Sequence, residues 1–335
     1  MSETLSLNLQ ACMGLCVLIG IGVALSENPR AISPKLLVNA LALQVILALM
    51  LLKVPPMVTG LGVINRGVLA LAAATRQGSS FVYGYIGGGA LPFEAIHPAN
   101  TLVFAFQILP LVLVVSALAA IGWHLKLLPL IINTLGILFH KPLNTRGAAG
   151  FAVIANVFVG QVEAPLLVKP HIENMSRYEL LLLMTAGMTM IAGTMMVVYS
   201  VLLAPSVPNI GVHLIVKSMM SIPAAILFAH LLLPEPTDLR ASTATTAPVI
   251  TRPYHSSLDA LTRGTQDGIH IWFATSAMLL VLVSLVALIN SALGTLPPVF
   301  DAALSLERIA GWIFAPVAYL MGIPWQDSCW ALRPS

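Results

Sequence analysis

Long apolar runs separated by short polar segments dominate the chain. A helix needs about 20 apolar residues to cross a hydrocarbon core about 30 Å thick. Six runs come close to or exceed that length, so we predict six transmembrane helices. They are the charge-free stretch between Glu3 and Glu27, and residues 36–52, 101–123, 180–204, 212–233 and 269–293.

Two further stretches are less apolar and carry charged residues. Residues 60–76 contain Asn65, Arg66 and Arg76, and residues 125–140 mix leucine and isoleucine with polar residues. This composition is typical of a helix that lies in the membrane interface. We therefore expect both stretches to be interfacial helices.

Residues 147–172 form two short apolar arms around a polar break. The first arm ends at Gly160, the break reads Gly-Gln-Val-Glu-Ala-Pro over 160–165, and the second arm runs to Lys169-Pro170. A non-helical tip at membrane depth is tolerated only where it lines a protein-walled or watery cavity. We predict a re-entrant hairpin here, and the first arm of a second hairpin over 307–323, interrupted by Pro316.

Together these elements predict an all-α integral membrane protein. It has about six transmembrane helices, one complete re-entrant hairpin, the start of a second, and interfacial helices. The predicted organisation is an N-terminal scaffold (1–146), a first transport repeat of hairpin and two spans (147–233), a polar linker (234–268), a scaffold span with its connection (269–306), and the beginning of a second hairpin (307–335).

Composition supports a membrane protein and argues against other classes. Of 335 residues, 58% are hydrophobic and 9% are charged, whereas soluble domains carry about a quarter charged residues. The net charge of +3 includes no long basic run, so we expect no nucleic-acid partner. Basic loops favour the cytoplasmic side, which places Arg30, Lys35 and the 234–268 linker inside and the N-terminus outside.

Glu163 is the most informative polar residue. It lies beside Gln161 within an apolar segment, where an acidic side chain is expensive unless it faces a cavity or a substrate path. An interrupted apolar segment of this kind is typical of a transporter substrate site. Asn156, one helical turn earlier, could offer its side-chain oxygen to a cation. The alternatives are an exposed loop around Glu163 and a buried helix-capping role for Asn156.

Catalytic signatures are missing from the sequence. It contains no His-Glu-x-x-His, no Gly-x-Ser-x-Gly and no phosphate-binding loop of the Walker type. Cys12 and Cys16 lie one helical turn apart, which is too few ligands for a metal site. We therefore expect no enzyme activity, no resident metal and no cofactor.

The segment Asn156–Pro170, which reads Asn-Val-Phe-Val-Gly-Gln-Val-Glu-Ala-Pro-Leu-Leu-Val-Lys-Pro, is similar to the first-hairpin signature of the concentrative nucleoside transporters. Supporting similarities follow the order expected in that family. They lie at residues 105–118, 187–194, 226–235, 311–316 and 322–325.

The resemblance implies a homotrimeric, multi-pass transporter of the cell (inner or plasma) membrane that imports nucleosides in symport with sodium or protons. It also implies how the site residues divide. Those expected to contact the nucleobase are Gly160, Gln161, Val162 and Glu163, with Met195 packing nearby. Those expected to bind the coupling cation are Asn156, Val159 and the segment from Thr189 to Ile191.

Several positions depart from the family pattern. Met190 stands where many members have serine or threonine, and a thioether is a poor ligand for a hard cation. Val162 replaces a common hydroxyl residue, and Gln107 occupies a position that is often arginine. The coupling ion, sodium or proton, and the preference for purine or pyrimidine nucleosides therefore stay open.

Two motifs that hold the ribose in the family do not occur in these 335 residues. They are Asn-Glu-Phe-Val-Ala-Tyr of the second hairpin and Gly-Phe-Ala-Asn-x-Ser-Ser of the seventh span. An unpaired buried polar group costs about 1–3 kcal/mol, so their loss would weaken substrate binding. Two hypotheses result: an active nucleoside:cation symporter, or a C-terminally truncated, transport-incompetent product without the ribose-binding repeat.

Overall fold

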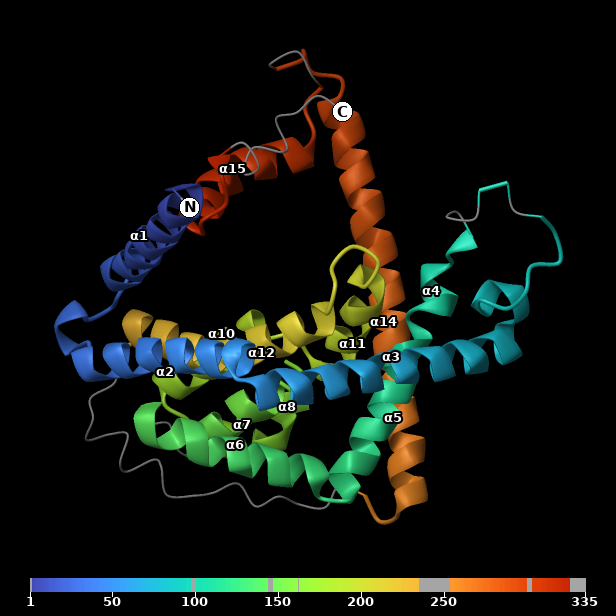
Figure 1. Ribbon diagram of the computed structural model, residues 1–335, viewed down its shortest axis with the longest axis horizontal. Helices are drawn as coiled ribbons and strands as arrows, with labels where there is room; N and C mark the ends of the chain where they lie inside the picture. The colour runs from blue at the N-terminus through green and yellow to red at the C-terminus, as the bar shows by residue number, and fades with distance from the viewer. Residues whose placement is uncertain are drawn as a thin grey trace. The chain divides into compact units, whose positions relative to one another are not determined.

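The structure is a computed structural model that describes residues 2–94, 96–97, 101–143, 147–161, 163–234, 254–299 and 303–325. Within these ranges the regular elements are helices (Figure 1). The longer ones are α1 (Ser2–Ala24), α2 (Pro34–Lys53), α3 (Pro55–Tyr83), α5 (Pro110–His124), α6 (Leu127–Leu143), α10 (Arg177–Thr189), α11 (Gly193–Leu203), α12 (Ile210–Leu232), α14 (Ser257–Leu293) and α15 (Leu306–Leu320).

Short helices connect the longer ones. Two are 3-10 helices, in which each backbone hydrogen bond joins residues three apart, so the turn is tighter than in an α-helix. They are η1 (Pro29–Ala31) and η2 (Gly84–Gly87), and the short α-helices are α4 (Phe104–Gln107), α7 (Gly147–Asn156), α8 (Glu163–Leu167) and α9 (Lys169–Ile172).

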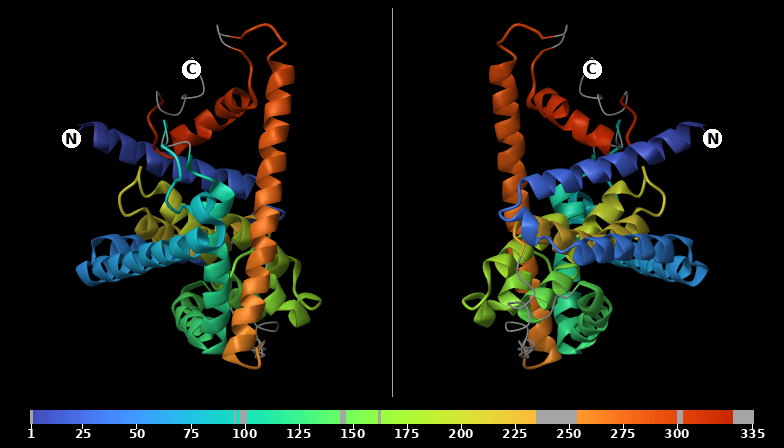
Figure 2. Two further views of the ribbon diagram at one scale, coloured as in Figure 1. Left: turned by 90° about the vertical axis from the view of Figure 1, so that its right-hand side faces the viewer. Right: turned by 90° about the vertical axis from the view of Figure 1, so that its left-hand side faces the viewer.

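Two compact units make up the chain. The central unit comprises Glu27–Ala274, and the terminal unit comprises Met1–Ser26 with Thr275–Ser335. α14 contributes its N-terminal half to the central unit and its C-terminal half to the terminal unit, and it is one unbroken helix in Figure 2. The five-part organisation expected from the sequence stays a prediction.

Six segments of the described residues are long and apolar enough to cross a membrane. They are Pro34–Lys53, Pro55–Gly87, Phe104–His124, Arg177–Leu203, Ile210–Leu232 and Ser257–Leu293. Five of these segments correspond to predicted spans. The remaining one, Pro55–Gly87, contains α3. The fold class is therefore confirmed as an all-α membrane protein with six candidate spans.

α3 is longer than the interfacial helix expected over 60–76. It continues without a break from Pro55 to Tyr83. The two prolines at its start fit the first helical turn, where a backbone amide has no partner within the helix. Its end comes at Gly84, whose φ of 62° closes the helix. The predicted first span is also helical, although its apolar part among the described residues, Leu9–Ala24, is shorter than a full crossing.

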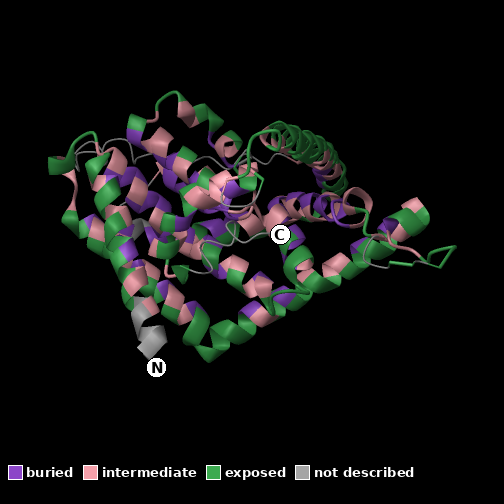
Figure 3. Ribbon diagram, turned by 90° about the horizontal axis from the view of Figure 1, so that it is seen from above, coloured by how far each residue is buried: buried purple, intermediate pink, exposed green. Residues whose placement is uncertain are grey.

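α12 is the centre of the packing in the central unit. It lies against α2 on one side and α10 on another, and α11 and α3 also contact it. Ile222, Ile226 and Leu227 on this helix are almost fully buried. Figure 3 shows buried positions concentrated in this group of helices, whereas the C-terminal half of α14 is largely exposed.

The terminal unit is built on the contact between α1 and α15. The Gln10 side chain donates hydrogen bonds to the backbone oxygens of Tyr319 and Ile323. Gly14 permits the close approach, since a Cβ there would lie 1.7 Å from the Leu320 oxygen. α15 continues through Pro316, so the prediction that this proline interrupts the apolar arm is wrong. The second-hairpin assignment itself stays a prediction.

Candidate substrate and cation site

The predicted hairpin tip lies between α7 and α8. α7 is buried along nine of its ten residues, from Ala148 to Asn156, as its small and apolar side chains allow. The helix then ends, and Gly160 adopts a φ of 123°, a conformation that only glycine adopts readily. α8 starts at Glu163. The structure therefore has the helix–break–helix arrangement that the Gly and Pro residues predicted.

A second break faces the first. The apolar run 180–204, predicted as one span, is divided into α10 and α11 by extended backbone at Met190 and Ala192. Gly193 packs directly on the hairpin, since a Cβ there would lie 2.5 Å from the Phe158 oxygen. Two interrupted helices thus meet at one place, an arrangement that transporters use for substrate and ion sites.

Asn156 links the two breaks. Its Nδ2 donates a 2.9 Å hydrogen bond to the backbone oxygen of Ala186 in the last turn of α10. Its Oδ1 is buried and has no hydrogen-bond partner. Buried polar atoms are normally satisfied, so an unpaired oxygen at this position fits a cation or a substrate donor. This oxygen is the strongest structural support for the predicted cation site.

Thr189 shares the acceptor that Asn156 uses. The Thr189 hydroxyl lies 3.0 Å from the Thr185 oxygen and 3.4 Å from the Ala186 oxygen. The amide of Met190 also reaches the Ala186 oxygen, at 3.2 Å. Asn156 and Thr189 are therefore neighbours, and their binding of a cation stays a prediction.

Three further predicted site residues lie at or near the two breaks. Val159, Ile191 and Met195 are half-buried. Met195 packs against the apolar cluster formed by α5 and α11, which includes Val112 and Val198. Its role near the nucleobase stays a prediction.

The hairpin tip itself has one buried and one exposed residue. Gly160 is buried, and Gln161 is exposed. Val162 lies outside the described residues, as does the side chain of Glu163. Their substrate contacts also stay predictions.

Lys217 of α12 reaches the same turn of α10, which the sequence alone did not reveal. Its Nζ donates a hydrogen bond to the backbone oxygen of Thr189. Lys217 follows the start of α12 at Ile210 by seven residues, or about 10 Å along the helix. The available signal was a lysine within an otherwise apolar span, because a charge there is costly and usually functional.

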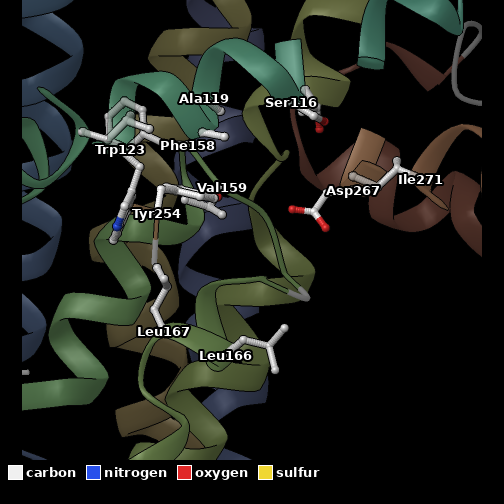
Figure 4. A pocket seen from close by; sticks show the side chains of 13 residues that line it. Ser116, Ala119, Trp123, Phe158, Val159, Leu166, Leu167, Tyr254, Asp267 and Ile271 are labelled. Atoms are coloured by element: carbon white, nitrogen blue, oxygen red, sulfur yellow. The ribbon is translucent and has the colours of Figure 1, made fainter. Parts of the chain in front are cut away.

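A cavity of about 320 Å³ lies beside the hairpin, between α5 and the N-terminal half of α14. Its lining is mostly apolar, and Figure 4 shows the Asp267 carboxylate facing it. Burial raises the pKa of the Tyr254 phenol, and the charge of Asp267 raises it further, so the phenol stays a hydrogen-bond donor at neutral pH. Of the predicted site residues with described side chains, Val159 lines this cavity.

Metal binding finds no support in the described part of the chain. No group of three histidine, cysteine, aspartate or glutamate side chains lies close enough together there to hold a metal ion.

Three family models match successive parts of the chain. Residues 13–86 match "Na+ dependent nucleoside transporter N-terminus", residues 105–206 match "Gate: Nucleoside recognition", and residues 213–331 match "Na+ dependent nucleoside transporter C-terminus". The middle match contains both helix breaks.

Curated relatives resemble the chain along almost its whole length. An uncharacterized transporter of Haemophilus influenzae is 34% identical over 324 residues, covering 94% of this chain and 72% of the relative. Nucleoside permease NupC of Helicobacter pylori is 31% identical, covering 96% and 74%. Sodium/nucleoside cotransporter 1 of Rattus norvegicus is 28% identical, covering 94% and 46%.

Solved structures of CNTnw also resemble the chain along almost its whole length. The structure of CNTnw in an inward-facing substrate-bound state superposes with a TM-score of 0.83 at 31% identity, covering 96% of this chain and 74% of the other. An outward-facing CNTnw variant superposes with a TM-score of 0.86.

Proposed function

Because the chain belongs to the concentrative nucleoside transporter family, we propose that it imports nucleosides in symport with a cation, either sodium or protons. It is a multi-pass protein of the plasma membrane and a transporter, not an enzyme. The observation that carries the proposal is the meeting of the hairpin break with the α10–α11 break around the unpaired Asn156 oxygen.

The hairpin tip supplies one half of the proposed substrate site. Gly160 brings the backbone into a left-handed conformation, which leaves room for a planar base to approach. Gln161 can both donate and accept hydrogen bonds, and the Glu163 carboxylate can accept them from base or sugar. Val162 and Met195 would supply apolar contact with the base. These polar and apolar groups together suit a nucleoside.

The proposed cation position lies between Asn156 and the end of α10. Oxygen ligands are needed for sodium, and the two breaks offer Asn156 Oδ1, the Val159 carbonyl and the Thr189–Ile191 backbone carbonyls. The carbonyls at the C-terminal end of α10 also carry partial negative charge, which favours a cation.

The family resemblance further leads us to propose a homotrimer. Cross-linking in the native membrane, followed by mass determination, would identify the assembly. A monomeric or dimeric mass under conditions that preserve uptake would contradict a trimer.

Uptake of radiolabelled uridine and adenosine into transport-deficient cells tests the main proposal. We expect accumulation that collapses when the sodium and proton gradients are both dissipated. Replacing sodium with choline, and separately adding a protonophore, assigns the coupling ion. Uptake equal to that of empty cells would instead support the alternative that these 335 residues do not transport by themselves.

A further inference from the structure

We propose that the ammonium of Lys217 is a tethered cation that takes the place of sodium at the end of α10. This inference rests on the proposed nucleoside transport and assigns the ion chemistry of that same site. It predicts that nucleoside binding requires no sodium, because the positive charge at the helix break is already supplied by the chain.

Lys217 reaches the C-terminal end of α10. Lys217 Nζ donates to the backbone oxygen of Thr189, the final residue of α10. Thr189 and Asn156 both bond to the Ala186 oxygen of the same turn. The ammonium therefore lies at the turn that carries the proposed cation ligands.

The charge distribution at the C-terminal end of a helix favours an ammonium there. The last carbonyls of a helix have no partners within the helix and carry partial negative charge. An ammonium has three donors and no acceptor, so it can satisfy several such oxygens at once. A sodium ion bound at the same oxygens would be repelled by the Lys217 charge only a few bond lengths away.

The local side chains also fit an organic cation better than sodium. Met190, which follows Thr189, is buried and offers a thioether sulfur where sodium would need oxygen. The Thr189 hydroxyl already donates within α10. A lysine within a membrane helix is costly unless its charge is used, and the Thr189 carbonyl gives Lys217 a partner.

A purely structural role for Lys217 is the competing explanation. α12 packs on α10, and the lysine could only tie these two helices together. If Lys217 only links the two helices, its loss lowers the stability of the protein equally in every salt. If it acts as a tethered cation, its loss leaves an empty cation position at the Thr189 oxygen that sodium can occupy, so the two roles differ in their response to sodium.

The experiment measures thermal unfolding and uridine binding of the purified full chain in sodium chloride and in choline chloride at equal ionic strength. For the wild type we expect the same Tm and the same Kd in both salts. For Lys217→Met we expect a lower Tm in choline, a rise of about 2–4 °C when sodium is supplied, and a Kd that is about tenfold weaker in choline than in sodium. Lys53→Met, at the end of α2, is the control and should respond to neither salt.

Three results would overturn the inference. Saturable binding of radioactive sodium to the wild type is one, and it needs no variant to fold. A Lys217→Met protein that behaves like Lys53→Met is the second. A variant that is destabilised equally in sodium and choline is the third, because it indicates only a structural tie. Wild type that binds no uridine in either salt contradicts the proposed function instead, while the Tm and sodium-binding measurements still decide the role of Lys217.

Discussion

At the scale of single residues, Asn156 performs two tasks with one carboxamide. Its nitrogen holds the hairpin to α10 through the Ala186 oxygen, and its oxygen is left free in a buried position. Asn156→Ala removes both. We expect a loss of about 1–3 kcal/mol in stability and at least about a tenfold fall in uridine uptake.

The matched control for this substitution is Asn39→Ala. Asn39 also donates one hydrogen bond to a backbone oxygen, that of Pro142, but it is exposed and lies on α2. Stability is read from the Tm and function from initial uptake rates normalised to membrane expression. Uptake that falls equally in both variants would remove Asn156 from the site.

Glu163→Gln tests the hairpin tip. The substitution keeps size and polarity but removes the negative charge, and hydrogen bonds to charged groups contribute about 1.5–3 kcal/mol. We expect nucleoside uptake to fall by about 10- to 100-fold. Glu173→Gln, at the end of the same hairpin, is the control and should keep wild-type uptake. Unchanged uptake kinetics in Glu163→Gln would exclude Glu163 from the mechanism.

Residue-level prediction was possible where the signal was local. The Asn-x₃-Gly-Gln-x-Glu-x-Pro pattern pointed to the hairpin break and to Asn156, because glycine, proline and a membrane-embedded acid each carry meaning within a few positions. The pairing of Lys217 with Thr189 joins residues 28 apart. Only the packing of α12 on α10 shows it, since both lie in separate apolar runs.

At the scale of elements, the contact between the two breaks depends on Gly193. Alanine there would place a Cβ 2.5 Å from the Phe158 oxygen, which is backbone and cannot move independently. We expect Gly193→Ala to push α11 away from the hairpin, to cost about 1–3 kcal/mol and to abolish high-affinity uridine binding. The readouts are the Tm and equilibrium binding.

Gly78→Ala provides the comparison. It lies within α3 with no heavy atom near its would-be Cβ, so alanine should leave binding unchanged and stabilise the helix slightly. If Gly193→Ala bound uridine as tightly as Gly78→Ala, the two helix breaks would not form one site.

Element boundaries were predictable where sequence punctuation existed. The break after α7 coincides with Gly160 and the Glu-Ala-Pro run, and α2 begins at a proline. The break at Met190–Ala192 falls within a charge-free run, so hydrophobicity alone predicted one continuous span, and only the family resemblance implied the unwinding. Arg66 and Arg76 suggested a separate interfacial helix, yet α3 has no proline after its first turn and runs through both.

At the scale of the whole molecule, the number of crossings decides which loops share a side of the membrane. Four predicted spans separate the basic loop at Arg30 from the basic linker 234–268, so both are cytoplasmic if α3 lies in the interface. α3 is, however, long and apolar enough to cross. If it crosses, an odd number of spans separates the two basic loops, and one of them must be external.

Single cysteines read by a membrane-impermeant thiol reagent distinguish these topologies. The native Cys12, Cys16 and Cys329 are first replaced by alanine, and the probes are Asn28→Cys, Ser206→Cys and His255→Cys, all at exposed positions. We expect labelling of Ser206→Cys in intact cells and of the other two only after permeabilisation, because α12 is the candidate span among the described residues between Ser206 and His255. Opposite labelling of Asn28→Cys and His255→Cys would make α3 a true crossing. The positive-inside pattern favours the first result, since it keeps Arg30, Lys35 and the linker arginines on the cytoplasmic side together.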